Sequence, residues 1–198
     1  MKLLNQKVGT TMSSQVWWIA SRSAGLISWA MLSLSIVWGL QLSTKTMKKA
    51  IKRPWLLGTH QTLGGLATVF LLVHVVTLLF DKFTNFNLID IIVPFSSSWH
   101  PVWVTWGIVG AWMLIAVELT SLIKKHLSKK IWHAIHMLSF LLWIVGTIHG
   151  FLSGPDSQSM IAIAVAVFLA VPIIIMTILR MYLWVNEPIM PPRIPLRS

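Results

Sequence analysis

Five apolar segments, each long enough to cross a lipid bilayer, constrain the fold of this chain more than any other feature. A helix needs about 20 residues to span roughly 30 Å of hydrocarbon. The segments run approximately over residues 16–40, 55–80, 101–123, 131–152 and 160–185. Of the 198 residues, 56% are hydrophobic and 11% are charged, which is unlike a soluble globular domain. The sequence therefore predicts an all-α, polytopic transmembrane helical bundle of about five spans, with residues 1–198 forming a single domain in contact with membrane lipid.

The basic residues gather in alternate loops between these segments. Residues 45–54, residues 124–130 and the C-terminal end are rich in Lys and Arg, whereas residues 81–100 are nearly free of them. Because basic loops stay in the cytoplasm, we expect the N-terminus outside and the C-terminus inside a cell membrane, such as a bacterial plasma membrane. The net charge of +11 then reflects membrane orientation, and nucleic acid is not expected as a partner. The residues on the cytoplasmic side are Lys45, Lys48, Lys49, Lys52, Arg53, Lys124, Lys125, Lys129, Lys130, Arg180, Arg193 and Arg197; those on the other side are Lys2, Lys7 and Lys82.

The absence of cysteine limits the metal chemistry open to this chain. With no Cys, it cannot form disulfides, cysteine-ligated iron–sulfur clusters, thiolate zinc sites or the covalent attachment of a c-type haem. Any metal must be held by histidine, carboxylate or backbone groups.

Four histidines lie inside two of the apolar segments with nearly the same spacing. His60 and His74 are fourteen residues apart, and His136 and His149 are thirteen apart. At 1.5 Å per residue, each pair is separated by roughly 20 Å along its helix, so the two members cannot share one ion. Both segments run outward from a basic loop, which groups the residues across helices: His60 with His136 at the inner depth, and His74 with His149 at the outer depth.

Two imidazoles facing each other at one depth suit the two axial positions of a haem iron. The sequence therefore predicts two non-covalent haems b, the inner iron held by His60 and His136 and the outer iron by His74 and His149. For any one of these residues alone, a hydrogen-bonded packing role is the alternative. A zinc site is disfavoured because it needs three or four ligands around one ion. Ionisable residues inside a membrane tend to mark function.

Helical phase supports one spacing better than the other. At about 100° per residue, His60 and His74 lie within roughly 40° of one face, whereas His136 and His149 lie some 140° apart. We therefore expect a distortion of the 131–152 helix, such as a wide turn, or a rotation of the two haem planes about the membrane normal. His133 is an alternative inner ligand, although its spacing from His149 matches the other pair less well.

Small residues lie near the histidines along both segments. Gly64 and Gly65 lie between His60 and His74, and Gly146 lies one turn before His149. Such residues allow a flat macrocycle, or simply a neighbouring helix, to come close.

The sequence resembles the ferric reductase-like transmembrane domain shared by NADPH oxidases, ferric reductases and the small haem subunit of bacterial periplasmic methionine sulfoxide reductase. The paired histidine spacings, SRSAGL (21–26) and HMLSFLLWIVGTIHG (136–150) are similar to that family's patterns, over about residues 16–185. The resemblance implies a membrane conduit that passes electrons one at a time from the inner to the outer haem b. With both axial positions occupied, the irons should favour electron transfer over ligand binding.

Arg22 and Glu118 are charged residues inside the apolar segments. The resemblance places Arg22 near the outer haem, in contact with a propionate or with the site where an acceptor is reduced; snorkelling to the outer interface is the alternative. Glu118, near the inner end of its segment, is expected to pair with Lys124 or Lys125, with a proton or quinone role as the alternative.

The chain has no glycine-rich dinucleotide motif, although larger relatives carry flavin and nicotinamide domains. The electron donor is therefore expected to be a cytoplasmic flavoprotein or a membrane quinol, so that flavin or quinone comes from a partner. The chain would act as the haem-containing membrane subunit of an oxidoreductase and deliver electrons to a periplasmic or extracellular redox partner, ferric iron or oxygen. A quinol-linked di-haem cytochrome b and a non-redox transporter or scaffold with structural histidines are the alternatives.

Overall fold

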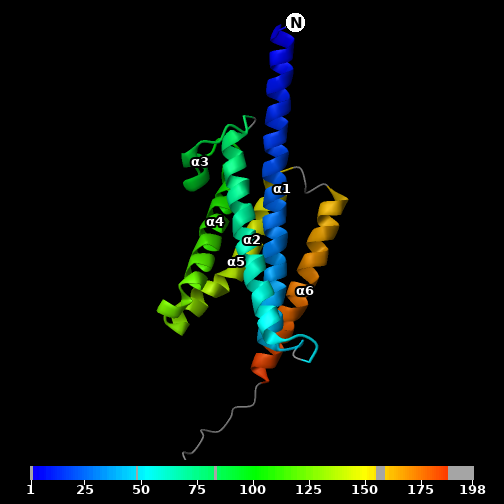
Figure 1. The fold of residues 1–198 in the computed structure, drawn as a ribbon, viewed down its shortest axis with the longest axis vertical. Coiled ribbons are helices and arrows are strands. Elements are labelled where there is room, and N and C mark those ends of the chain that lie inside the picture. Colours follow the sequence, from blue (N-terminus) through cyan, green and yellow to red (C-terminus); the bar gives the residue numbers. More distant parts are fainter. Residues whose placement is uncertain (1, 48, 83, 155–158, 187–198) are drawn as a thin grey trace, which may run out of the picture.

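The computed structural model describes residues 2–47, 49–82, 84–154 and 159–186, and within these ranges the chain contains helices and loops but no strand. The elements are α1 (Lys2–Thr44), α2 (Arg53–Phe80), α3 (Leu88–Ile92), α4 (Pro101–Leu122), the 3-10 helix η1 (Lys124–His126), α5 (Lys129–Leu152) and α6 (Met160–Val185) (Figure 1). The prediction of an all-helical bundle is confirmed.

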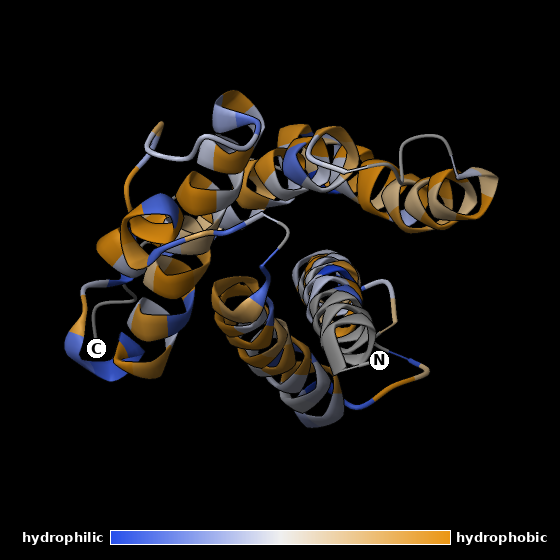
Figure 2. Ribbon diagram, turned by 90° about the horizontal axis from the view of Figure 1, so that it is seen from above, coloured by the Kyte–Doolittle hydropathy of each residue, from blue (hydrophilic) through white to orange (hydrophobic). Residues whose placement is uncertain are grey.

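Five of these helices are long and apolar enough to cross a membrane. The candidate spans are Gln15–Thr44, Arg53–Phe80, Pro101–Leu122, Lys129–Leu152 and Met160–Val185, within a few residues of the predicted bounds. Their outward faces carry large apolar side chains that remain exposed, as in α6, where Phe168 is 75% exposed. Apolar residues dominate the long helices when the bundle is seen from above (Figure 2). The chain is a multi-pass membrane protein.

Local signals in the sequence set where the helices begin. Pro54 and Pro101 lie in the first turns of α2 and α4, where a proline loses no helical hydrogen bond. Ser128 and Ser159 cap α5 and α6 by accepting hydrogen bonds from the backbone N–H groups of Ile131 and Ala162. These caps satisfy backbone donors that lipid could not.

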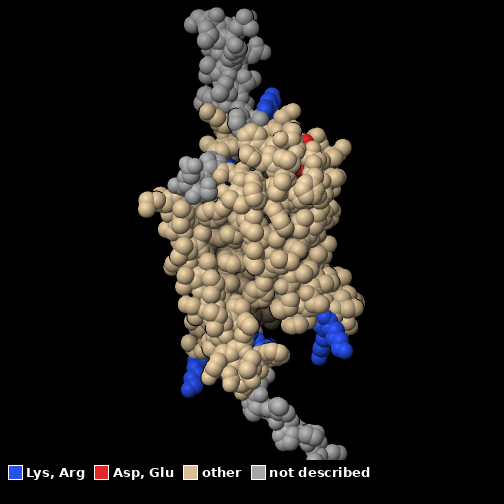
Figure 3. Space-filling view, turned by 180° about the vertical axis from the view of Figure 1, so that it is seen from behind, with Lys and Arg blue, Asp and Glu red and all other residues tan. Residues whose placement is uncertain are grey.

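Successive long helices run in opposite directions, so the loops that follow α1 and α4 lie at the same end of the bundle (Figure 1). Lys and Arg gather at this end, and the middle of the face seen from behind carries no charged side chain (Figure 3). We call the end of the bundle that holds these two loops the basic end. Lys48, Arg193, Arg197 and the side chains of Lys2 and Lys7 lie outside the described part of the chain. This difference in charge between the two ends is the basis for the prediction that the basic end faces the cytoplasm.

Helix packing divides the bundle into two antiparallel pairs. Helix α1 packs mainly on α2, and α4 packs mainly on α5, while α1 also contacts α5 and α6. A buried apolar cluster joins the five long helices, and most of its residues lie between the levels of the inner and outer histidines. Its members are Leu32, Ile36, Leu40, Ala67, Leu114, Leu142 and Ile173.

A reciprocal set of hydrogen bonds joins α1 to α5 at the same intermediate depth. The indole N–H of Trp29 donates to Thr147 Oγ1 (2.9 Å), and Thr147 Oγ1 donates to the carbonyl of Trp143 (2.7 Å). In the opposite sense, the indole of Trp143 donates to Ser33 Oγ (2.9 Å), which donates to the carbonyl of Trp29 (2.8 Å). We call these four residues the tryptophan clasp. Every polar group of the clasp side chains has a partner, as an apolar environment requires.

Candidate functional site

The four intramembrane histidines meet in two pairs across α2 and α5. The ring centroids of His60 and His136 are 5.8 Å apart, with an angle of 75° between the ring planes. The ring centroids of His74 and His149 are 6.3 Å apart, with an angle of 74°. The grouping expected from depth is therefore the one that the structure contains: an inner pair towards the basic end and an outer pair towards the opposite end.

Backbone carbonyls fix the orientation of both outer histidines. Nδ1 of His74 lies 2.8 Å from the carbonyl oxygen of Ser21 on α1, and Nδ1 of His149 lies 2.8 Å from that of Trp103 on α4. Because a carbonyl oxygen only accepts, each Nδ1 must carry the proton and donate it. In a neutral imidazole this leaves the lone pair on Nε2, the atom available to bind a metal ion.

The inner pair is held in a similar way, but less evenly. Nδ1 of His60 donates to the carbonyl of Ser35 on α1 at 2.9 Å. Nδ1 of His136 lies 3.4 Å from Ser121 Oγ on α4, and that hydroxyl donates its own proton to the carbonyl of Val117 at 2.7 Å. The hydroxyl is then left to accept from His136. Nε2 is therefore the free nitrogen here too, but the hydrogen bond to His136 is the longest of the four.

Three glycines provide the space that the imidazoles occupy. A Cβ atom on Gly25 would lie 3.0 Å from Nδ1 of His74, and one on Gly39 would lie 3.3 Å from Cε1 of His60. A Cβ on Gly107 would come within 2.5 Å of Cε1 of His149, a separation that real Cβ contacts do not reach. Gly107 therefore requires the smallest residue, whereas a larger residue at Gly25 or Gly39 would make the facing imidazole shift by a few tenths of an ångström.

The glycines singled out from the sequence have other neighbours. A Cβ on Gly64 would face the Glu118 carboxylate at 3.5 Å, one on Gly65 would meet open space, and one on Gly146 would lie 3.8 Å from the Trp29 ring. That Gly64 and Gly65 give room to a macrocycle stays a prediction; Gly146, like Trp29, lines the outer cavity described below.

A repeat in the sequence marks the supporting residues, although the histidine spacing alone did not reveal it. The repeated positions are Ser21 and Gly25, then Ser35 and Gly39 on α1; and Trp103 and Gly107, then Val117 and Ser121 on α4. In both helices the second set follows the first by fourteen residues, the spacing of His60 and His74 on α2. On α1 the residue types repeat as well, so a search of the spans for this spacing could have found Ser21, Gly25, Ser35 and Gly39; on α4 the residue types differ and the sequence carries no such signal.

A cavity of about 960 Å³ surrounds the outer pair. This volume is at the upper end of the range of about 300–1,000 Å³ that is usual for small-molecule and cofactor sites. His74, His149 and Arg22 line it together with Trp99 and His100 from the loop before α4. It is a space large enough for a planar macrocycle, closed on two sides by imidazoles.

Arg22 lines this cavity, at the depth of the outer pair. Its guanidinium carbon is 4.7 Å from the ring centroid of Trp18, and its guanidinium nitrogens lie against Gly154, where a Cβ would clash with them. The cation therefore borders the same space as His74 and His149.

Sequence reasoning did not single out His100. This residue occupies the left-handed region (φ 41°) as the N-cap of α4, and its ring lies 5.0 Å from that of Trp99. Its place in a loop, outside the apolar segments, hid its proximity to the outer pair.

The expected wide turn in the helix of His136 and His149 is wrong. Helix α5 is regular α-helix from Lys129 to Leu152. The other expectation, a rotation of the two haem planes about the membrane normal, stays a prediction.

At the inner end, His136 and not His133 faces His60. His133 is exposed beside Trp132, with ring centroids 6.3 Å apart.

No ion pair joins Glu118 to Lys124 or Lys125 among the described residues, so the expected pairing of Glu118 is wrong. Glu118 instead turns inward to α2 at Gly64, and Lys124 Nζ lies 4.4 Å from the centroid of the Trp132 ring.

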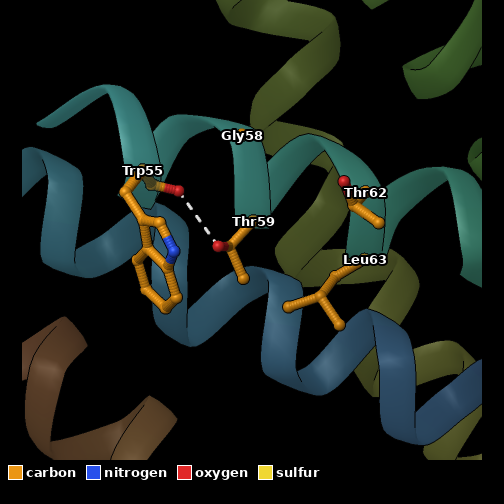
Figure 4. A pocket seen from close by; sticks show the side chains of 5 residues that line it. All are labelled: Trp55, Gly58, Thr59, Thr62 and Leu63. Carbon is orange, nitrogen blue, oxygen red and sulfur yellow. Dashed lines mark hydrogen bonds between the residues drawn. The ribbon is translucent and has the colours of Figure 1, made fainter.

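A second depression, of about 370 Å³, lies on one face of α2 near its start (Figure 4). It is lined by Trp55, Gly58, Thr59, Thr62 and Leu63. Thr59 Oγ1 is satisfied within the helix by the carbonyl of Trp55 at 3.0 Å. With no titratable side chain in its lining, this depression offers no ligand for a metal.

The residues present fit a haem at the outer pair. An imidazole nitrogen bonds a first-row metal ion at about 2.0–2.1 Å, so two opposite axial imidazoles have centroids roughly 6 to 6.5 Å apart. The outer pair is at 6.3 Å and borders the large cavity. In the part of the chain described here, no three or more His, Cys, Asp or Glu side chains gather as a metal-binding group. Two imidazoles therefore suit the iron of a haem, because the porphyrin supplies the other ligands of the iron.

The inner pair, at 5.8 Å, is slightly closer than that range, with nearly the same angle between its rings and the same use of Nδ1. The indole N–H of Trp132, whose ring stacks on that of His136 at 5.0 Å, is buried without a hydrogen-bond partner among the described residues. Such unpaired donors in an apolar environment are costly, and a bound group that carries acceptors would satisfy them.

No protein-family model, curated protein or solved structure matches this chain, so the geometry of the two histidine pairs carries the functional argument.

Proposed function

We propose that this protein carries electrons across the membrane between two haems b, one held at the inner pair and one at the outer pair. A single observation carries the proposal: two pairs of imidazoles at two depths, each ring bonded through Nδ1 so that Nε2 is free to bind a metal ion. Hydrogen bonding of the second nitrogen is how proteins orient and tune histidine ligands. The bound haem supplies the one-electron chemistry.

In this function the chain holds the two haems, orients them and separates them from the lipid. His60 and His136 provide the inner ligands, His74 and His149 the outer ones. The apolar cluster and the tryptophan clasp join the helices that carry the two levels. Arg22 provides a positive charge at the outer cavity, where it would meet a propionate or an anionic acceptor.

The donor is best sought at the basic end. Lys45, Lys49, Lys52 and Lys124 are exposed there and would attract an acidic surface of a cytoplasmic flavoprotein. The chain would thus be the membrane subunit of an oxidoreductase that delivers electrons to a partner at the outer end. A quinol donor is the competing proposal; quinone-site inhibitors would slow turnover only in that case.

A zinc or proton transporter fits the same residues less well. Zinc requires three or four ligands around one ion, and the histidines of the described chain meet only in twos. A protein of that kind would also be colourless after purification.

Proteoliposomes that contain trapped ferricyanide test the proposed function. Dithionite added outside should bleach the trapped ferricyanide when haem-loaded protein is present, because neither reagent crosses the bilayer unaided. Vesicles with His74→Ala should transfer electrons far more slowly. If the wild-type protein binds haem but ferricyanide persists as long as in protein-free vesicles, transmembrane electron transfer is not its function.

The ring planes supply a second, spectroscopic test. Because the imidazoles of both pairs are close to perpendicular, each ferric site should give the strongly anisotropic low-spin EPR signal of crossed axial imidazoles. A rhombic signal typical of parallel rings would mean that the bound state differs from this geometry.

A further inference from the structure

The ring of Trp132 connects the inner histidine pair to the surface of the basic end. It stacks on the ring of His136 with a centroid distance of 5.0 Å and 22° between the planes, and His136 faces His60. The same tryptophan ring has Lys124 Nζ at 4.4 Å from its centroid, and this lysine is exposed. An unbroken series of contacts therefore runs from a surface cation, through an aromatic ring, to a candidate iron ligand.

This stack is particular to the inner pair. Among the described residues, His136 is the one intramembrane histidine whose ring contacts a tryptophan ring, whereas His74 and His149 contact each other. Holding the imidazole in place is a competing role for the stack, since the hydrogen bond from His136 Nδ1 is the longest of the four, at 3.4 Å. Anchoring the end of α5 at the membrane interface is a second competing role, which is common for tryptophan.

Exposed lysines form two separate groups at the basic end. One group surrounds η1, and the other lies between α1 and α2, on the opposite side of the bundle in Figure 1. The first contains Lys124, Lys125, Lys129 and Lys130, and the second contains Lys45, Lys49 and Lys52. In the described chain, only the first group includes a lysine in contact with a ring that reaches a histidine. Because the rate of electron tunnelling falls steeply with distance, a donor bound at the first group is better placed to reduce the inner haem.

We propose that electrons enter this protein at Trp132, from a flavoprotein whose acidic surface docks on the lysines around η1. Positive charge there attracts such a surface. The inference rests on the proposed function and adds to it the place where the donor binds. One electron leaves the reduced flavin of the donor, which is thereby oxidised by one electron, and reduces the inner iron from ferric to ferrous. Trp132 lies in the path without being oxidised itself; no bond to the chain forms or breaks, and no proton passes to it.

Flavodoxin, a small acidic flavoprotein, is the probe for docking. On the purified full-length protein, bound flavodoxin should shield Lys124 and Lys125 from acetylation, read by mass spectrometry, while Lys49 keeps reacting. High ionic strength should abolish the shielding, because salt screens exposed charges. This readout does not depend on turnover. If flavodoxin shields Lys49 as strongly, or shields no lysine, the docking place is wrong and the inference fails.

Stopped-flow reduction of the inner haem by reduced flavodoxin tests the path. Trp132→Leu removes the aromatic ring, and we expect several-fold slower reduction with unchanged haem content and an unchanged midpoint potential. Trp55→Leu, an exposed tryptophan at the same end, is the matched control and should reduce at the wild-type rate. Lys124→Gln should also slow reduction, whereas Arg53→Gln, an equal loss of charge beside the other group, should not.

The readouts separate the three roles of Trp132. Slow reduction together with a shifted potential or a lost inner haem would assign the ring to holding His136, and an unchanged rate would assign it to the membrane interface. Either result overturns the inference. If both haems b bind and ferricyanide in the vesicles is still bleached, the proposed function stands even then; if no haem b binds, the proposed function itself fails.

Discussion

At the scale of single residues, the candidate site depends on backbone carbonyl groups that a sequence pattern does not reveal. Three of the four histidines are oriented by backbone carbonyls, which every residue possesses. The histidines could be predicted because an imidazole in an apolar span is conspicuous, whereas Ser21, Ser35 and Trp103 differ from their neighbours only by position. The same holds for Gly25, Gly39 and Gly107, whose role becomes visible only when the facing helix is in place.

Gly107→Ala should empty the outer site. The added methyl would meet the His149 ring at a distance that neither group can accept, so the imidazole must rotate away. We expect haem content to fall from about two to about one per chain, measured as pyridine haemochrome per protein. Gly65→Ala, where a Cβ meets open space, is the matched control and should keep full content. Equal haem content in the two variants would contradict the placement of His149.

Ser121→Ala should change the redox potential of the inner haem. It removes the one side-chain acceptor of the His136 Nδ1 proton, which makes the imidazole a weaker donor to ferric iron. The midpoint potential of one haem should therefore rise, on the order of tens of millivolts. Ser21→Ala should have a smaller effect on the other haem, because the carbonyl that holds His74 remains. A redox titration that finds both potentials unchanged in Ser121→Ala would separate Ser121 from the inner site.

At the scale of helices, hydropathy predicted the spans within a few residues because lipid requires every backbone group to be satisfied inside a helix. The helical extension before Gln15 was not predicted, since those residues are too polar to signal a span. The regular course of α5 was not predicted either, because an ideal wheel ignores side-chain torsions and helix inclination. Pairing between helices, in contrast, followed from depth alone.

Thr147→Val should loosen α5 from α1. The substitution keeps the shape of the side chain but removes the acceptor of the Trp29 indole and a donor to the Trp143 carbonyl. We expect a loss of about 1–2 kcal/mol in the free energy of unfolding, measured by titration with a denaturing detergent. Thr62→Val, on the exposed face of α2 (Figure 4), should change it little. A stability loss as large in Thr62→Val would mean that the clasp adds nothing specific.

At the scale of the whole molecule, the charge asymmetry predicts which end faces the cytoplasm. The absence of native cysteine allows a direct test, because any introduced thiol is the sole target of a maleimide. Ser98→Cys, in the loop before α4, should react with a membrane-impermeant maleimide in intact spheroplasts. His126→Cys, in η1 at the basic end, should react only after lysis. The reverse pattern would invert the predicted orientation and, with it, the direction of electron flow.

The central claim is that two pairs of histidines each hold one haem b, and haem content after single substitutions tests it most directly. Purified wild-type protein, expressed with adequate haem supply, should give a haemochrome value of about two haems b per chain. His60→Ala and His136→Ala should each lose the same haem, identified by its midpoint potential, and His74→Ala and His149→Ala should each lose the other. A wild-type protein without haem, or one haem that survives all four substitutions, would contradict the account.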